Sequence, residues 1–200
     1  MGSREMTDPI RVERSDRFTY RDYSVWPDNE RWELIDGAVH SMSPSPTWRH
    51  QTLVLKLAGI ISAAVKSTDC RLAIAPFDVL LSDSSGINEE DIETVVQPDL
   101  LVVRDPVKVK EHGCVGAPDW IIEILSPSST YRDMGEKLRL YERHGVGEYW
   151  IVDPVGDTVT VHVLENGTYG RSRLYTQDQR IEVATLSSLT VSLEEIFRAS

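Results

Sequence analysis

Residues 95–103 read Val-Val-Gln-Pro-Asp-Leu-Leu-Val-Val, and residues 120–125 read Trp-Ile-Ile-Glu-Ile-Leu. Both stretches are almost wholly apolar, which predicts buried β-strands, and each carries one acid, Asp99 or Glu123. A carboxylate inside a sheet is costly unless it is paired, protonated or bound to a cation. The chain between the two stretches is long enough for the strands to be neighbours. Their acids could then converge on one ion.

A polar helix follows the second strand, from about residue 133 to about residue 144, and Gly145 ends it. Asp133, Lys137 and Tyr141 share one face of this helix, since they recur at i, i+4 and i+8. Alone, this face is typical of an exposed Asp–Lys pair. After the two strand acids, Lys137 can instead reach back to the sheet and steady a water or a phosphoryl oxygen. Two carboxylates and an ammonium indicate a divalent metal acting on a phosphodiester.

The pattern of the remaining chain predicts an α/β (α+β) fold, a sheet with at least one helix on each side. We expect a hairpin over residues 31–43 with its turn at Asp36-Gly37. A helix follows, with an apolar stripe that includes Leu53 and Leu57. The other expected elements are strands over 72–81, 149–152, 159–163 and 180–183, an acidic loop over 83–93, a connection over 104–118 and a helical turn over 193–197.

Composition bounds the class of protein. With 200 residues, 40% of them apolar, we expect a single domain over residues 17–200, and we set aside residues 1–16 as a disordered or cloning-derived segment. No apolar run approaches the ~20 residues of a membrane span. Cys70 and Cys114 lie in no metal or redox spacing, so we expect a cytoplasmic protein. The net charge of −11 argues against tight, nonspecific DNA binding.

Glu33, His50 and Asp119 are three further candidates for the site. Glu33 is either a third acidic ligand or a strand residue facing water, and the second interpretation is favoured. His50 stands at the start of the first long helix, where a histidine is more often a surface or capping group. Asp119 shares the face parity of Glu123, but four strand steps place the two about 13 Å apart, so they cannot hold one ion.

In order along residues 20–163, the sequence resembles the Uma-type restriction endonucleases of the PD-(D/E)xK nuclease superfamily. Each piece is weak by itself, and the ordered set is specific. The pieces are Trp32-Glu33-Leu34-Ile35-Asp36-Gly37, Ser43-Pro44-Ser45-Pro46 with His50, Ala75-Pro76-Phe77-Asp78-Val79, Val96-Gln97-Pro98-Asp99-Leu100, Gly116-Ala117-Pro118-Asp119, Ile122-Glu123-Ile124-Leu125-Ser126-Pro127-Ser128, Asp133, Lys137, Tyr141 and Glu148-Tyr149-Trp150-Ile151-Val152-Asp153.

The resemblance implies a restriction-endonuclease-like core, a central mixed β-sheet flanked by helices. Asp99 matches the aspartate of the motif and Glu123 its second acid. Leu125 stands where the lysine of the motif usually lies, and the resemblance gives that role to Lys137 on the next helix. Mg²⁺ or Mn²⁺ would be held by Asp99, Glu123 and the main-chain carbonyl of Ile124. Further residues implied at the site are Glu33, which would place a second ion or water, and the accessory residues His50, Asp133 and Tyr141.

The function expected is that of a metal-dependent endonuclease that hydrolyses DNA by a metal-activated water. The alternative is a catalytically inactive module of the same fold that binds protein or nucleic acid, with its acids paired to Lys137. Two-carboxylate glycoside hydrolysis is weaker, because it has no need of a lysine. We expect weak, salt-dependent DNA binding and a homodimer that cuts both strands. The expected DNA contacts are Arg132, Arg139 and Arg143, with Lys108 and Lys110.

Overall fold

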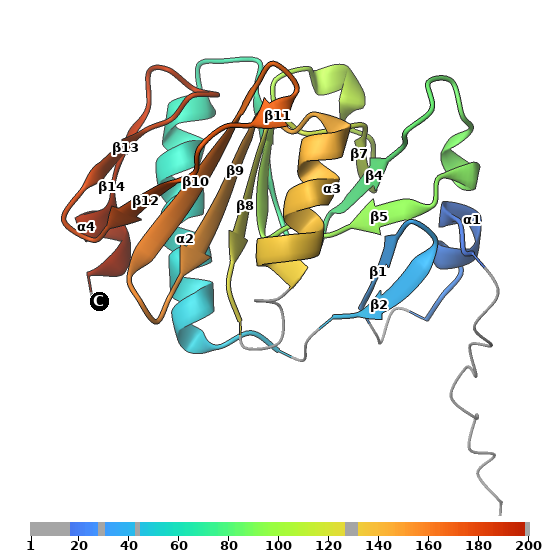
Figure 1. The fold of residues 1–200 in the computed structure, drawn as a ribbon, viewed down its shortest axis with the longest axis horizontal. Coiled ribbons are helices and arrows are strands. Elements are labelled where there is room, and N and C mark those ends of the chain that lie inside the picture. Colours follow the sequence, from blue (N-terminus) through green and yellow to red (C-terminus); the bar gives the residue numbers. More distant parts are fainter. Residues whose placement is uncertain (1–16, 28–30, 43–44, 127–131, 199–200) are drawn as a thin grey trace, which may run out of the picture.

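The structure is a computed structural model that describes residues 17–27, 31–42, 45–126 and 132–198. The prediction for residues 1–16 therefore lies outside the described residues, and the single domain over 17–200 stays a prediction. The predicted α/β (α+β) class is confirmed, since helices cover both faces of a mixed sheet (Figure 1). None of the helices in the described ranges is both long and apolar enough to span a membrane.

The larger sheet has seven strands in the order β11-β10-β9-β8-β6-β3, with β12 paired to β10. It is mixed, because β8 and β9 run parallel while the other neighbours run antiparallel. Its strands are β3 (Arg71–Ile74), β6 (Leu100–Val103), β8 (Trp120–Ile124), β9 (Glu148–Asp153), β10 (Thr158–Glu165), β11 (Thr168–Tyr169) and β12 (Arg173–Thr176).

A second sheet has five strands in the order β2-β1-β5-β4-β7, and a third has two strands, β13 and β14. These strands are β1 (Trp32–Ile35), β2 (Ala38–Ser41), β4 (Asp78–Leu81), β5 (Thr94–Val96), β7 (Gly113–Val115), β13 (Arg180–Glu182) and β14 (Thr190–Ser192). The helices are α1 (Tyr20–Tyr23), α2 (Trp48–Val65), α3 (Lys137–His144) and α4 (Leu193–Phe197), with 3-10 turns Glu89–Asp91 and Pro106–Lys108 and a π-helical turn Arg132–Glu136.

Two stretches expected as continuous strands are each broken and shared between the two larger sheets. The stretch 72–81 divides around Pro76 into β3 and β4, and the stretch 95–103 divides around Pro98 into β5 and β6. Proline has no N–H to donate to a ladder, so a strand inside a sheet cannot continue through it. Asp99 therefore lies where the chain leaves the five-stranded sheet and enters the seven-stranded one.

Helices α2 and α3 pack on opposite faces of the larger sheet (Figure 1). Along β8, Ile122 and Ile124 join the cluster under α2, whereas Ile121 joins the cluster under α3. Side chains alternate between the faces of a strand, so Glu123 shares the face of Ile121 and points toward α3. The alternation of side chains along β8 thus points Glu123 toward α3, the helix that begins with Lys137.

Thr47 caps α2, and its side-chain oxygen accepts a hydrogen bond from the backbone N–H of His50 at 3.2 Å. Replacing Thr47 with alanine is expected to lower the free energy of unfolding by about 1 kcal/mol, since it removes an N-cap acceptor. Urea denaturation measures this loss. Thr52→Ala is the matched control, because that hydroxyl only bonds back to the carbonyl of Trp48 within the helix. Equal losses in both variants would contradict a capping role.

Candidate active site

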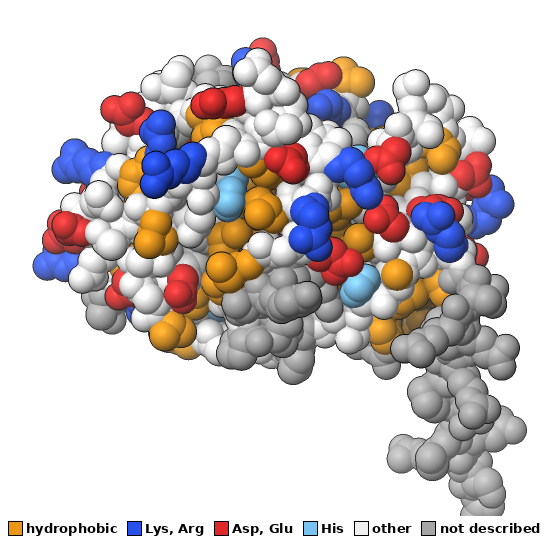
Figure 2. Space-filling view, viewed as in Figure 1, with side chains coloured by type: hydrophobic (Ala, Val, Ile, Leu, Met, Phe, Trp, Pro, Cys, Tyr) orange, Lys and Arg blue, Asp and Glu red, His pale blue; other side chains and the backbone are white. Residues whose placement is uncertain are grey.

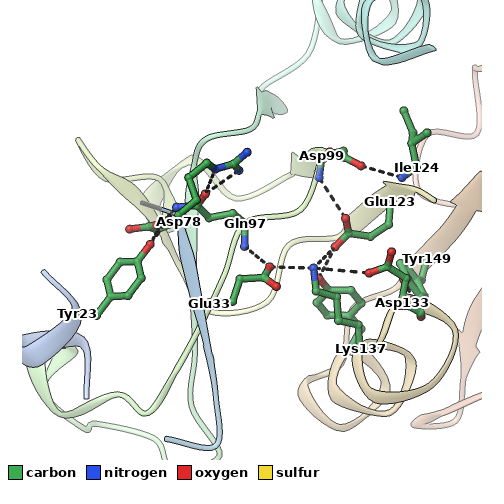
Figure 3. Close-up of polar contacts among 12 residues, drawn as sticks. Tyr23, Glu33, Asp78, Gln97, Asp99, Glu123, Ile124, Asp133, Lys137 and Tyr149 are labelled. Atoms are coloured by element: carbon green, nitrogen blue, oxygen red, sulfur yellow. Dashed lines mark hydrogen bonds and ion pairs between the residues drawn. The ribbon is translucent and has the colours of Figure 1, made fainter. Parts of the chain in front are cut away.

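Asp99 and Glu123 are brought together by the pairing of β6 with β8. The strands run antiparallel with Leu100 opposite Ile122, so the next pair along the register is Asp99 and Glu123. The backbone N–H of Asp99 lies 3.4 Å from Glu123 Oε2, and Asp99 Oδ2 accepts from the backbone N–H of Ile124 at 2.8 Å (Figure 3). The two predicted metal ligands therefore face each other across one pair of strands.

Lys137 reaches this pair from the start of α3. Its Nζ lies 2.9 Å from Glu123 Oε1, 2.8 Å from Glu33 Oε1 and 3.8 Å from Asp133 Oδ1 (Figure 3). The lysine side chain is only 4% exposed. The interpretation of Asp133 and Lys137 as an ordinary exposed ion pair is therefore wrong. The Lys137 ammonium is instead buried at the centre of a cluster of carboxyl groups.

Glu33 does not face water, contrary to the favoured interpretation of the sequence. It is 1% exposed, and besides Lys137 its Oε1 accepts from the backbone N–H of Gln97 at 2.9 Å. Gln97 belongs to the break between β5 and β6, whose peptide groups are not occupied by a regular ladder. The junction of the two sheets thus shelters Glu33 and supplies donors for it.

The ionisation of this cluster follows from burial and from an excess of acids. Burial raises the pKa of Glu123; Lys137 opposes this, and the neighbouring carboxyl groups of Asp133, Asp99 and Glu33 add to it. Burial alone would lower the pKa of Lys137, but its carboxylate neighbours outweigh burial and hold that pKa well above its usual value. The lysine therefore stays in its charged form, in contact with the carboxyl groups of Glu123, Glu33 and Asp133.

The accessory residues His50 and Tyr141 each contact one of the two strand acids. His50 Nε2 lies 3.2 Å from Asp99 Oδ2, and the Tyr141 hydroxyl donates to Glu123 Oε1 at 2.9 Å. His50 is 9% exposed, so a surface or capping role for its side chain is wrong. Its Nδ1 is buried and has no hydrogen-bond partner within the described ranges. Both side chains hold an oxygen of a predicted ligand in place.

Replacing Tyr141 with phenylalanine is expected to cost about 1–2 kcal/mol of unfolding free energy, because a buried carboxylate oxygen loses one of its donors. The cost should shrink in a Glu123→Gln background, where the acceptor carries no charge, and a double-mutant cycle by urea denaturation measures that coupling. Tyr175→Phe, on β12, is the control and should change stability little. The same loss with and without Glu123 would contradict the contact.

The residues expected to touch DNA are placed less favourably. Arg143 pairs with Asp36 at 2.5 Å and Asp83 at 3.2 Å, while Arg139 is exposed on α3. The side chain of Arg132 lies outside the described part, and Lys108 donates to the carbonyl of Ala117. Figure 2 shows cations and acids intermixed over the face that carries α3. DNA contact by these residues stays a prediction.

A polar cluster beside the site was not anticipated. The carboxylate of Asp78 accepts from the Tyr23 hydroxyl at 2.9 Å and from the Gln97 side-chain amide at 2.8 Å, and Arg31 donates to the same amide group (Figure 3). Burial raises the pKa of Asp78. In the sequence, the one sign of this cluster is the polar residue Gln97 inside an apolar run. The cluster fixes the side chain of Gln97, whose backbone N–H donates to Glu33.

The oxygen donors around Asp99 and Glu123 form an open set rather than a closed cage. No group of three or more His, Cys, Asp or Glu side chains among the described residues forms a cage for a metal ion. An open set fits Mg²⁺ nonetheless, because this ion keeps several waters and needs few protein ligands. Asp99 and Glu123 supply hard oxygens on adjacent strands, and the Asp99 side chain is 19% exposed. The residues therefore fit the ion.

A mixed sheet with helices on both faces, and with two acids on adjacent strands beside a lysine, defines a restriction-endonuclease-like protein. The chain belongs to the Uma2 family, described as "Putative restriction endonuclease", whose model matches residues 20–194. It is 21% identical to an uncharacterized protein of Synechocystis sp. over 180 residues, which are 88% of this chain and 90% of the relative.

A solved structure confirms the predicted fold. It is described as a putative nuclease belonging to DUF820 from Anabaena variabilis, and it matches with a TM-score of 0.72 at 22% identity. The match covers 90% of this chain and 97% of that one. The resemblance read from the ordered motifs and the restriction-endonuclease-like fold are thus both confirmed, while the roles of the individual site residues stay predictions.

Proposed function

We propose that the protein is a metal-dependent endonuclease that hydrolyses phosphodiester bonds in DNA. One observation carries the proposal: Asp99 and Glu123 face each other on adjacent strands beside the buried ammonium of Lys137. The Asp99 side chain is 19% exposed, so this pair of acids lies at an edge that an ion can reach from solvent. Membership of a family of restriction endonucleases supports the same function.

Asp99, Glu123 and the main-chain carbonyl of Ile124 would hold Mg²⁺ or Mn²⁺. A bound divalent ion lowers the pKa of a coordinated water and offsets charge on the departing oxygen. The residues around these ligands would orient them and stabilise the developing charge.

Each ligand is oriented through one of its oxygens. His50 and the backbone N–H of Ile124 hold Asp99 Oδ2, and Lys137 with Tyr141 holds Glu123 Oε1. The oxygens that would meet the cation are Asp99 Oδ1 and Glu123 Oε2, and Oε2 also lies 3.4 Å from the backbone N–H of Asp99. Lys137, kept charged by its acidic neighbours, adds a fixed positive charge beside the place where a phosphoryl group would lie.

The inactive module remains the second candidate, because Lys137 already occupies one oxygen of Glu123. The two functions differ in their response to metal. An intact site gains stability from Mg²⁺ or Mn²⁺, since a ligand that binds only the folded state raises the melting temperature. A cluster satisfied by its own lysine does not respond.

The deciding experiment is thermal unfolding with increasing Mg²⁺ or Mn²⁺, on the unaltered protein, on Asp99→Ala and on the control Asp119→Ala. Asp119 immediately precedes β8, and its carboxylate accepts a hydrogen bond from the backbone N–H of Arg104, away from the site. We expect a metal-dependent rise in melting temperature in the unaltered protein and in Asp119→Ala, and none in Asp99→Ala. A rise that survives Asp99→Ala would place the ion elsewhere, and no rise at all would favour the inactive module.

A further inference from the structure

Arg31 is an exposed arginine beside the acid cluster, directly before the strand that carries Glu33. Its carbonyl accepts a hydrogen bond from the backbone N–H of Met42, so the antiparallel pairing of β1 with β2 extends to it. Residues two apart on a strand point to the same face and lie about 7 Å apart. Arg31 therefore shares a face with Glu33, whose Oε1 lies 2.8 Å from the Lys137 ammonium.

The guanidinium group of Arg31 is bound by an amide rather than by an acid. Its Nε and Nη2 lie 3.1 Å and 2.7 Å from Oε1 of Gln97. Arg31 forms no ion pair with an acid in the described part of the chain. Arg143, by contrast, is bound to both Asp36 and Asp83. Because an amide oxygen has no net charge, the positive charge of Arg31 is not neutralised by the group that holds it.

The orientation of the Gln97 side chain is fixed by its other contacts. Its Nε2 donates to the Tyr23 hydroxyl at 2.9 Å and to Asp78 Oδ1 at 2.8 Å (Figure 3). Both N–H groups of the amide are used in this way, so Oε1 is the atom that remains for Arg31. The backbone N–H of Gln97 donates to Glu33 Oε1 at 2.9 Å. One residue thus holds the acid and the arginine in a fixed relation.

The contact with Gln97 leaves most of the donors of Arg31 free. A guanidinium has five N–H donors, and Gln97 takes two of them, so three remain for another acceptor. The planar group matches a phosphate or a carboxylate, which it can bind through two parallel hydrogen bonds. The net charge of the chain is −11, so an exposed cation that no acid neutralises is a favourable contact for an anionic ligand.

We propose that Arg31 binds a backbone phosphate of the substrate DNA close to the scissile phosphate, and that Gln97 is the positioning residue that holds its guanidinium. Successive nucleotides rise about 3.4 Å along one strand of a duplex. A phosphate at Arg31 would thus lie within a few nucleotides of one bound at Asp99 and Glu123. The inference rests on the proposed function for the identity of its ligand, and it assigns a DNA contact that the sequence did not indicate.

DNA binding without a divalent ion tests this contact apart from cleavage. Fluorescence anisotropy of a short labelled duplex, in EDTA and over a range of NaCl concentrations, gives the dissociation constant and its salt dependence. Arg31→Ala should raise the dissociation constant about tenfold and lower the slope of its salt dependence by about 1. Arg31→Lys keeps the charge but not the planar group, so it should keep most of the slope and only part of the affinity.

Arg173→Ala is the matched control, because it removes the same charge from an exposed residue of β12. Figure 1 shows β12 and β1 on opposite sides of the molecule. This variant should bind DNA as the unaltered protein does. In cleavage assays, Arg31→Ala should raise KM for DNA and leave kcat nearly unchanged, since its loss concerns a phosphate away from the reacting atoms.

The melting temperature with and without Mn²⁺ separates a phosphate contact from a structural role. Arg31→Ala should show the same metal response as the unaltered protein, and a lost response would overturn the inference by making Arg31 a support for Glu33. Unchanged DNA binding in Arg31→Ala, or an equal loss in Arg173→Ala, would overturn it and leave the nuclease function standing. Binding that depends on Arg31 in a protein that cleaves no DNA would uphold the inference and refute the nuclease function.

Discussion

Replacing Asp99 with asparagine is expected to reduce metal-dependent DNA cleavage about a hundredfold or more while the fold persists. Asparagine keeps the size of the side chain and one oxygen, so the acceptor for the backbone N–H of Ile124 survives. What it removes is the charge that would bind the cation, and loss of a metal ligand removes the activated water with it. Cleavage of plasmid DNA with Mn²⁺ and with Mg²⁺, followed on gels, measures the loss.

The control for this variant is Asp119→Asn, because Asp119 immediately precedes the strand that carries Glu123. Its carboxylate accepts only from the backbone N–H of Arg104 among the described residues, and it shows no contact with the cluster. Cleavage by Asp119→Asn should match that of the unaltered protein. Full activity in both Asp99→Asn and Glu123→Gln would refute the assignment of the site, whereas inactivity of all the proteins, the unaltered one included, would favour the non-catalytic module.

Replacing Lys137 with methionine is expected to lower the free energy of unfolding by about 3–5 kcal/mol at neutral pH, because it leaves buried carboxylates without their cation. Methionine nearly matches the length of the lysine stem, so lost packing contributes little. Urea denaturation measures the change. Lys110→Met is the matched control, since Lys110 is exposed and its replacement should alter stability by less than about 0.5 kcal/mol.

The loss in Lys137→Met should depend on pH in a defined direction. The folded-state pKa of Glu123 is already raised by burial, and removal of the ammonium raises it further. A carboxyl group whose pKa is higher in the folded than in the unfolded state destabilises the protein as pH rises between the two values. The deficit should therefore be larger at about pH 8 than at about pH 5. Adding Glu33→Gln and Glu123→Gln should recover part of it, and a deficit that ignores both pH and these changes would contradict a buried ion cluster.

Local patterns predicted the elements that carry the site. The apolar run over Trp120–Ile124 becomes the fully buried β8, and its period of two fixes the face to which Glu123 points. The spacing of Lys137 and Tyr141 likewise places both on one face of α3, and Gly145 ends that helix in a left-handed conformation. Asp133 lies in the π-helical turn that precedes the helix, still within 3.8 Å of the Lys137 ammonium. These features depend on neighbours within a few residues, so they can be predicted from the sequence.

Other features depend on contacts between distant segments, and here local reasoning failed. Glu33 comes from a hairpin of the five-stranded sheet, and nothing near it in sequence shows that Gln97 and Lys137 will enclose it. His50 was interpreted as a surface group because a helix start is usually exposed. Its burial results from the packing of α2 against the sheet, where Asp99 lies. Two stretches predicted as continuous strands break at Pro76 and Pro98, and nothing near either proline shows that the broken halves join different sheets.

The sequence by itself determined the class of fold, the two strand acids, and the helix that carries the lysine, because hydrophobic period and proline or glycine placement act locally. Only the tertiary structure decided which of these groups meet. The junction of two sheets brings Glu33 to Lys137, and the packing of α2 brings His50 to Asp99. Burying several carboxyl groups around one ammonium is favourable only when all their partners arrive together, so it is a property of the assembled fold rather than of any one segment.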